Sequence, residues 1–299
     1  MKKYCYSNKI PFLGLALLFL CATGGAITIG ALAFGVSRAA YLILLFPLLM
    51  GLAGGCLNLW AIGQGKIRSP WIATISGLMT GLVIYGVFLY SGYLLYRSEK
   101  IGWAEGTSPI EKAEVAADLD RSIVDNTGHP GFLGYLHQQS KNGLVIVGKK
   151  NGNNPPIVVK NQGVWLNWII ELLTICGITT VMSRWRVSAP FSEMANRWFN
   201  RADRLGTIAK ADIDQARQVL DEGRLEDFIA LVQIKGQLVT GGWEVHFKRC
   251  GENFEEVALT LGKAMVIRRK LKLRQQQAWI LNRSELDEVA AAMRKHHKV

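Results

Sequence analysis

Residues 163–182, GVWLNWIIELLTICGITTVM, decide the fold class of this chain. A helix needs roughly 20 predominantly apolar residues to cross the hydrocarbon core of a bilayer, and this stretch has that length. Trp165 and Trp168 lie near its start, where amphipathic rings favour the membrane interface, and Arg184 and Arg186 follow its end. The stretch therefore predicts a membrane-spanning helix that joins the two sizeable polar segments of the chain.

Three longer uncharged stretches precede it, at residues 10–37, 39–65 and 69–96. Uncharged runs of this length are typical of membrane helices rather than of strands in a soluble core. We predict three spans at about 11–35, 39–63 and 71–96, followed by the fourth at 163–183. The predicted fold class is an integral membrane α-helical bundle with four transmembrane helices, a small extracytoplasmic α+β cap and a cytoplasmic α+β domain.

The basic residues that flank the spans predict the orientation. In short loops and near span ends, positive charge marks the cytoplasmic side. On this chain it gathers before the first span, in the second loop and after the fourth span, at Lys2, Lys3, Lys9, Lys66, Arg68, Arg184 and Arg186. We therefore expect a multi-pass protein of the cell (plasma or inner) membrane with both termini in the cytoplasm.

A cleaved signal peptide is the alternative interpretation of the first span. Lys2 and Lys3 would form its basic start, and Ala31-Leu-Ala33 would be its cleavage site. The apolar run that begins at Pro11 is longer than the usual apolar region of ~7–15 residues. This length favours a retained helix.

The segment 97–162 is expected outside the membrane. Pro109 and Glu111 indicate a helix start after Ser108, and the helix is expected to end near Asp125. Residues 132–140 predict a second helix, and residues 144–147 and 157–159 predict short strands. His129 and His137 have no metal-ligand partner at helical spacing and are interpreted as ordinary loop histidines.

The segment 184–299 is expected to be an α+β domain with an antiparallel meander backed by helices. Residues 191–199 resemble an amphipathic connector, and helices are predicted from residues 212, 225 and 284. Trp243, Val245 and Phe247 alternate with polar residues, which predicts a half-buried strand. Further strands are predicted at 257–261, 270–274 and 278–281, with turns at 262–263 and 275–277.

One acidic residue, Glu171, lies inside the predicted spans. Asn167, Glu171 and Thr174 are spaced to share one helix face, and ionisable residues within spans usually face the bundle interior or a water-filled cavity. Two interpretations remain open for this intramembrane polar group. It either forms structural hydrogen bonds with neighbouring helices or contacts a proton or a substrate.

A basic run in the C-terminal segment is the second candidate site. Near an anionic leaflet each such residue contributes about 1 kcal/mol of attraction, which favours contact with lipid headgroups at the cytoplasmic face. A solvated strand face and an acidic partner are the alternatives, whereas nucleic acid is disfavoured because no helix-turn-helix, zinc ligand set or RNA-binding motif accompanies the run. The residues are Lys263, Arg268, Arg269, Lys270, Lys272 and Arg274.

Small residues recur at four-residue spacing inside the spans, for example at Gly51 and Gly55 and at Gly77 and Gly81. Such faces allow helix backbones to approach closely. Tight packing within the bundle is the first interpretation, and association with a second copy of the chain is the other.

The sequence contains none of the nucleophile-elbow, phosphate-loop, zinc-protease or Cys-x-x-Cys motifs, and no cofactor or metal is expected. We predict a non-enzymatic membrane scaffold or sensor with partner-binding segments on both sides of the bilayer. The alternative is a small membrane enzyme or permease that uses Glu171 and Asn167 near the outer face. Further polar residues around Glu171 would favour the alternative, and a dry, glycine-packed interior would favour the scaffold.

Overall fold

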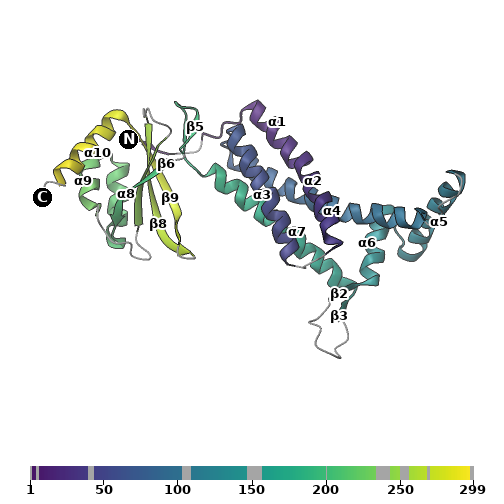
Figure 1. The fold of residues 1–299 in the computed structure, drawn as a ribbon. Helices are drawn as coiled ribbons and strands as arrows, with labels where there is room; N and C mark the ends of the chain where they lie inside the picture. Colours follow the sequence, from purple (N-terminus) through teal and green to yellow (C-terminus); the bar gives the residue numbers. More distant parts are fainter. Residues whose placement is uncertain are drawn as a thin grey trace. The chain divides into compact units, whose positions relative to one another are not determined.

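The computed structural model describes residues 2–4, 7–39, 44–102, 109–146, 157–199, 201–233, 243–249, 256–267 and 270–296. The chain divides into two compact units. Residues 10–186 form the first, here called the helical unit, and residues 1–9 together with 187–299 form the second, here called the α+β unit (Figure 1).

Four long helices dominate the helical unit. The first is continuous from α1 (Phe12–Leu20) through a π-helical turn (Cys21–Gly25) to α2 (Ala26–Ser37). The others are α3 (Leu45–Gly65), α4 (Pro70–Gly102) and α7 (Gln162–Val187). All four are long and apolar enough to cross a membrane, which confirms the four predicted apolar helices.

α4 extends beyond the predicted end at residue 96. Its polar end packs against the next helices, α5 (Pro109–Thr127) and α6 (Gly131–Asn142). Arg97 forms an ion pair of 3.1 Å with Asp120 of α5, and the ring of Tyr96 lies 5.3 Å from that of Tyr135 in α6. These contacts stabilise a helical end that hydropathy alone does not predict.

The two short strands of this region are β2 (Leu144–Ile146) and β3 (Ile157–Val159), and they pair antiparallel. The predicted helices and strands of segment 97–162 are therefore present, and Val147, the predicted end of the first strand, lies outside the described residues. Ser108, the predicted helix cap, lies outside the described residues.

Glycines allow the long helices to approach closely. An added Cβ at Gly77 of α4 would lie 2.6 Å from the Cα of Thr180 in α7, and one at Gly81 would lie 2.8 Å from the Cα of Cys176. Gly55 of α3 likewise meets Met182. The small-residue faces are thus used for packing within the bundle, as the first interpretation predicts.

The α+β unit contains a five-stranded antiparallel sheet in the order β1-β9-β8-β7-β6. Its helices α8 (Ile213–Asp221), α9 (Leu225–Leu231) and α10 (Arg283–His296) lie against one face of the sheet (Figure 1). The core between them is apolar and includes Phe228, Trp243 and Trp279. The strands are β1 (Lys2–Lys3), β6 (Arg201–Ile208), β7 (Trp243–Arg249), β8 (Glu256–Ile267) and β9 (Lys270–Asn282).

The predicted turns at 262–263 and 275–277 are wrong. β8 continues through Gly262 and β9 through residues 275–277, so the predicted third and fourth strands are one strand. The pairing shifts register between Leu261 and Lys263 instead. A bulge accommodates the extra residue without ending either strand. A glycine in one strand and a run of glutamines in the next do not distinguish a bulge from a turn.

Four of the observed strands were not predicted. β6 completes the sheet beside β7, and β1 pairs with β9 at the opposite edge. The predicted connector at 191–199 contains a small hairpin of β4 (Phe191–Ser192) and β5 (Arg197–Trp198). Phe191 and Trp198 are buried and pack edge to face, which explains why this segment reads as amphipathic.

Candidate functional site

Glu171 lies inside the helical unit, where its side chain accepts hydrogen bonds from two helices. The hydroxyl of Tyr85 in α4 donates to Oε2 at 2.7 Å, and Nδ2 of Asn167, one turn earlier in α7, donates to Oε1 at 2.8 Å. Glu171 is 3% exposed and Tyr85 is 4% exposed. The structure therefore places a carboxyl group with both oxygens hydrogen-bonded at the interface of α4 and α7.

Both oxygens of the buried carboxyl group thus have a hydrogen-bond donor. Such bonds offset part of the cost of burying a polar group. Thr174, the third residue of the predicted group, does not join: its hydroxyl donates to the carbonyl of Ile170 in its own helix at 2.7 Å. The group formed by Tyr85, Asn167 and Glu171 therefore links α4 to α7 by hydrogen bonds.

Sequence reasoning found Asn167 and Glu171 but missed Tyr85. The pair lies at helical spacing, whereas Tyr85 is 86 residues away from Glu171 along the chain. Tyr85 could have been found from its phenol hydroxyl in the middle of a long uncharged run, since polar groups in spans usually face the bundle interior.

A second polar cluster links three helices of the same unit. Asn58 of α3 is fully buried, and its Nδ2 donates to Thr80 of α4 at 3.0 Å and to Ser183 of α7 at 3.2 Å. Along α4 and α7 the fully buried Ile84 and Ile175 lie between this cluster and the one at Glu171. The two clusters are therefore separate layers with an apolar layer between them.

The two histidines of the segment between α4 and α7 lie side by side. The ring centroids of His129 and His137 are 4.6 Å apart, and the ring of His137 is 5.3 Å from that of Trp165. Gly128 and Gly131, before and after His129, adopt positive φ values of 76° and 60°, and His129 lies in the break between α5 and α6. Helical spacing therefore could not reveal the contact. Within the described residues no three metal-ligating side chains are grouped.

A buried carboxylate also lies in the α+β unit. Glu244 of β7 is fully buried, where the alternating pattern predicted a solvent-facing residue. Its carboxylate lies 3.2 Å from Nε of Arg204 in β6 and 3.1 Å from Nε2 of His246. The ion pair with Arg204 compensates a charge that the alternating pattern predicted to be hydrated.

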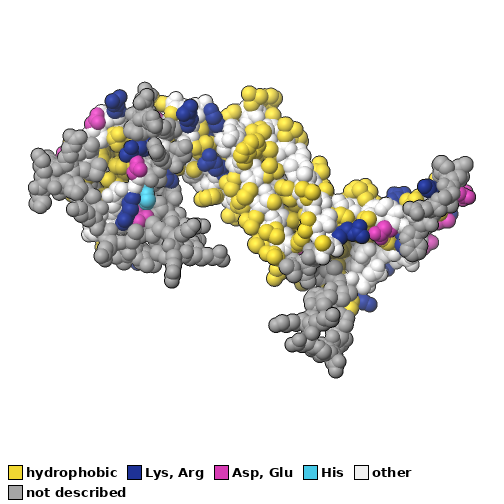
Figure 2. Space-filling view, in the orientation of Figure 1, with side chains coloured by type: hydrophobic (Ala, Val, Ile, Leu, Met, Phe, Trp, Pro, Cys, Tyr) yellow, Lys and Arg dark blue, Asp and Glu magenta, His cyan; other side chains and the backbone are white. Residues whose placement is uncertain are grey.

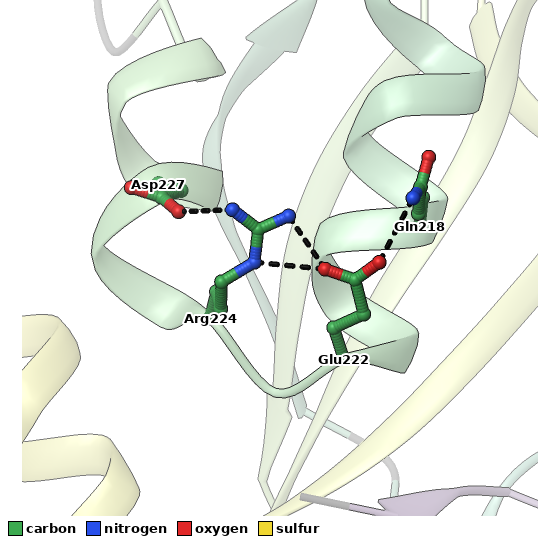
Figure 3. Close-up of polar contacts among 4 residues, drawn as sticks. All are labelled: Gln218, Glu222, Arg224 and Asp227. Atoms are coloured by element: carbon green, nitrogen blue, oxygen red, sulfur yellow. Dashed lines mark hydrogen bonds and ion pairs between the residues drawn. The ribbon is translucent and has the colours of Figure 1, made fainter.

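The polar turn between α8 and α9 is a further charged cluster (Figure 3). Glu222 accepts hydrogen bonds from Gln218 and Arg224, and Arg224 also donates to Asp227 at 2.8 Å. These hydrogen bonds, from Gln218 first and then Arg224, lower the pKa of the Glu222 carboxyl group. Because the residues are exposed and bond to one another across Gly223, the cluster connects the two helices at the surface.

For most of the predicted basic site, the structure describes only the backbone. Lys263 is half-buried and lies opposite Arg274 in the β8–β9 register, and Lys272 and Lys270 lie opposite Met265 and Ile267. Arg268 and Arg269 lie outside the described residues, as do the side chains from 264 to 276. Contact of this run with anionic lipid stays a prediction.

No known family model, characterised protein or solved structure matches this chain.

Proposed function

We propose that this chain is a non-enzymatic membrane scaffold or sensor whose four-helix bundle carries partner-binding segments on both sides of the bilayer. The close glycine packing between α4 and α7 is the observation that carries the proposal. Gly77 and Gly81 leave no room even for a methyl group before the backbone of α7. A bundle packed in this way is suited to holding attached segments in place.

The surface of the helical unit supports its place in a bilayer. Hydrophobic side chains cover much of the visible face of the bundle (Figure 2). Phe12 is 82% exposed and Leu13 is 81% exposed in the absence of lipid, and Leu173 of α7 is 64% exposed. Apolar surface of this extent is favourable when acyl chains cover it.

The N-terminal strand supports an orientation with both termini on one side. Residues 1–9 belong to the same unit as residues 187–299, and an even number of spans returns the chain to the side from which it began. The basic residues near the span ends favour the cytoplasm for that side. On this basis α5 and α6 lie outside.

The connectivity supports a sensor as well as a scaffold. The α+β unit is joined to the helical unit twice, before α1 and after α7. A displacement of α1 against α7 would act on the sheet through both connections. A change outside the membrane thus has a physical route to the edge strand β1.

Photocrosslinking in native membranes tests this function. We expect protein adducts from a photoreactive residue at Asp118 of α5 and at Asp214 of α8, whose side chains are 75% and 87% exposed. Leu173 of α7 is the control, because a lipid-facing position should give no discrete protein adduct. Absence of adducts from both soluble positions would reject the scaffold.

The same positions report orientation. In a background without native cysteines, an impermeant maleimide should modify Asp118→Cys on intact cells and Asp214→Cys only after permeabilisation. The reverse labelling pattern would show that the proposed orientation is wrong.

A permease or membrane enzyme is the second candidate, and the contact of Tyr85 with Glu171 favours it. Under the scaffold function, Glu171→Gln should lower bundle stability by about 1 kcal/mol, since interhelical hydrogen bonds in membranes contribute roughly 0.6–2 kcal/mol. Thermal unfolding in detergent and the adduct pattern provide the readouts.

Thr174→Val is the matched control, because its hydroxyl bonds within α7. Proton or solute flux into vesicles by the unmodified protein, lost in a folded Glu171→Gln variant but kept in Thr174→Val, would replace the scaffold by the second candidate.

A further inference from the structure

The chain's own N-terminus occupies part of one edge of the sheet. β1 pairs Lys2 with Ile280 and Lys3 with Trp279, and the amide of Tyr4 donates to the carbonyl of Ala278 at 2.8 Å. β1 has 2 residues, whereas β9 has 13. Among the described residues β8 is the only other strand that pairs with β9, so the stretch 270–274 of β9 has no strand on its outer side.

The attachment of β1 shows how this edge accepts an added strand. Lys3 Nζ lies 3.3 Å from Oδ2 of Asp221 and 5.9 Å from the centroid of the Trp279 ring. Trp279 in turn donates from Nε1 to Oδ1 of Asp221 at 2.9 Å. Backbone pairing thus sets the register of β1 on β9, and the ion pair between Lys3 and Asp221 adds a contact that depends on charge.

The charge of residues 270–274 determines which kind of strand can bind beside them. Lys270, Lys272 and Arg274 occupy alternate positions of β9, and the sequence from Lys263 to Arg274 contains no acidic residue. Like charges opposite one another destabilise strand pairing, and lysines on an edge discourage pairing between copies. A second copy of β9 is therefore repelled, whereas an acidic strand is attracted.

We propose that the β9 edge at residues 270–274 is a docking site for an extended, acidic polypeptide segment of a partner, which adds a strand beside β1. The inference rests on the proposed scaffold function and names the chemistry of its cytoplasmic partner. Main-chain hydrogen bonds supply affinity, and acidic residues opposite the basic ones supply specificity. Anionic lipid would use the charge but leave the outer backbone groups of β9 unpaired.

Fluorescence anisotropy with the full chain in neutral-lipid nanodiscs tests the proposal. The probe is a labelled peptide in which glutamate alternates with threonine, and its control carries N-methyl groups on alternate amides at unchanged charge. We expect the methylated peptide to bind at least about tenfold more weakly, because several backbone hydrogen bonds are lost.

Charge variants provide the second comparison. Lys270→Glu combined with Lys272→Glu should weaken binding of the unmethylated peptide about tenfold or more, since like charges then face one another. Lys210→Glu is the matched control, because it reverses an exposed lysine outside the sheet. The milder pair Lys270→Gln with Lys272→Gln should weaken binding less. This variant replaces the double glutamate variant in the comparison if the latter fails to fold.

Equal affinity for the methylated and unmethylated peptides would overturn the inference, since charge alone would then explain binding. So would protection of residues 270–274 from hydrogen exchange by anionic nanodiscs and not by the peptide, because lipid would then be the occupant. Failure of the two proposals is distinguishable. Adducts at Asp214 without peptide binding would support the scaffold and reject this docking site. Peptide binding without adducts would support the docking site and reject the scaffold.

Discussion

Replacing Trp279 by alanine is expected to destabilise the α+β unit by about 3–5 kcal/mol, the usual cost of removing a large aromatic side chain from a core. Trp279 is 1% exposed, lies opposite Leu259 in the sheet, and bonds through Nε1 to Asp221. Its loss leaves a cavity between the sheet and the helices. It also removes the ring over which Lys3 lies, so β1 should detach first.

Hydrogen exchange of the full chain in detergent measures this effect, with peptides from β7 and β8 as reporters. Trp279→Phe is the matched control: it keeps most of the ring and removes the donor to Asp221, and about 1 kcal/mol is expected for that hydrogen bond. Unchanged exchange in Trp279→Ala would contradict the position of this side chain in the core.

The membrane-type helices were predictable because their signal is local. An uncharged run of sufficient length indicates a helix wherever it occurs, and all four were found. The end of α4 was not predictable in the same way. It stays helical because Arg97 and Tyr96 contact α5 and α6, and no local pattern reports such a contact.

The sheet shows the same division between local and distant information. Alternation along β7 predicted the strand and its apolar face correctly, at Trp243, Val245 and Phe247. It misplaced Glu244, whose burial depends on Arg204 in another strand. β1 was not predicted because two lysines near a predicted span were interpreted as an orientation signal. Their pairing with β9 involves residues near the other end of the chain.

The candidate site also combines local and distant sequence information. Asn167 and Glu171 are one helical turn apart, so their contact follows from spacing alone. Tyr85 reaches Glu171 only because glycines bring α4 close to α7. The packing of these two helices therefore determines the geometry of the polar group.

Gly81→Leu is expected to separate α4 from α7. A Cβ at this position would lie 2.7 Å from Sγ and 2.8 Å from the Cα of Cys176, and the latter atom belongs to the backbone and cannot rotate away. Overpacking typically costs about 1–3 kcal/mol and occasionally more. A backbone clash in a bundle of close-packed helices belongs at the upper end, so we expect a lower unfolding temperature and loss of the Tyr85–Glu171 hydrogen bond.

Gly86→Leu makes the same substitution one and a half turns later in α4, where an added Cβ meets nothing within 4 Å. Both variants gain the helix propensity of leucine over glycine, about 1 kcal/mol, so the difference between them isolates the contact with α7. Thermal unfolding in detergent should show Gly86→Leu at or above the stability of the unmodified protein and Gly81→Leu well below it. Equal unfolding temperatures would contradict the close approach of α4 and α7, and with it the observation on which the proposed scaffold rests.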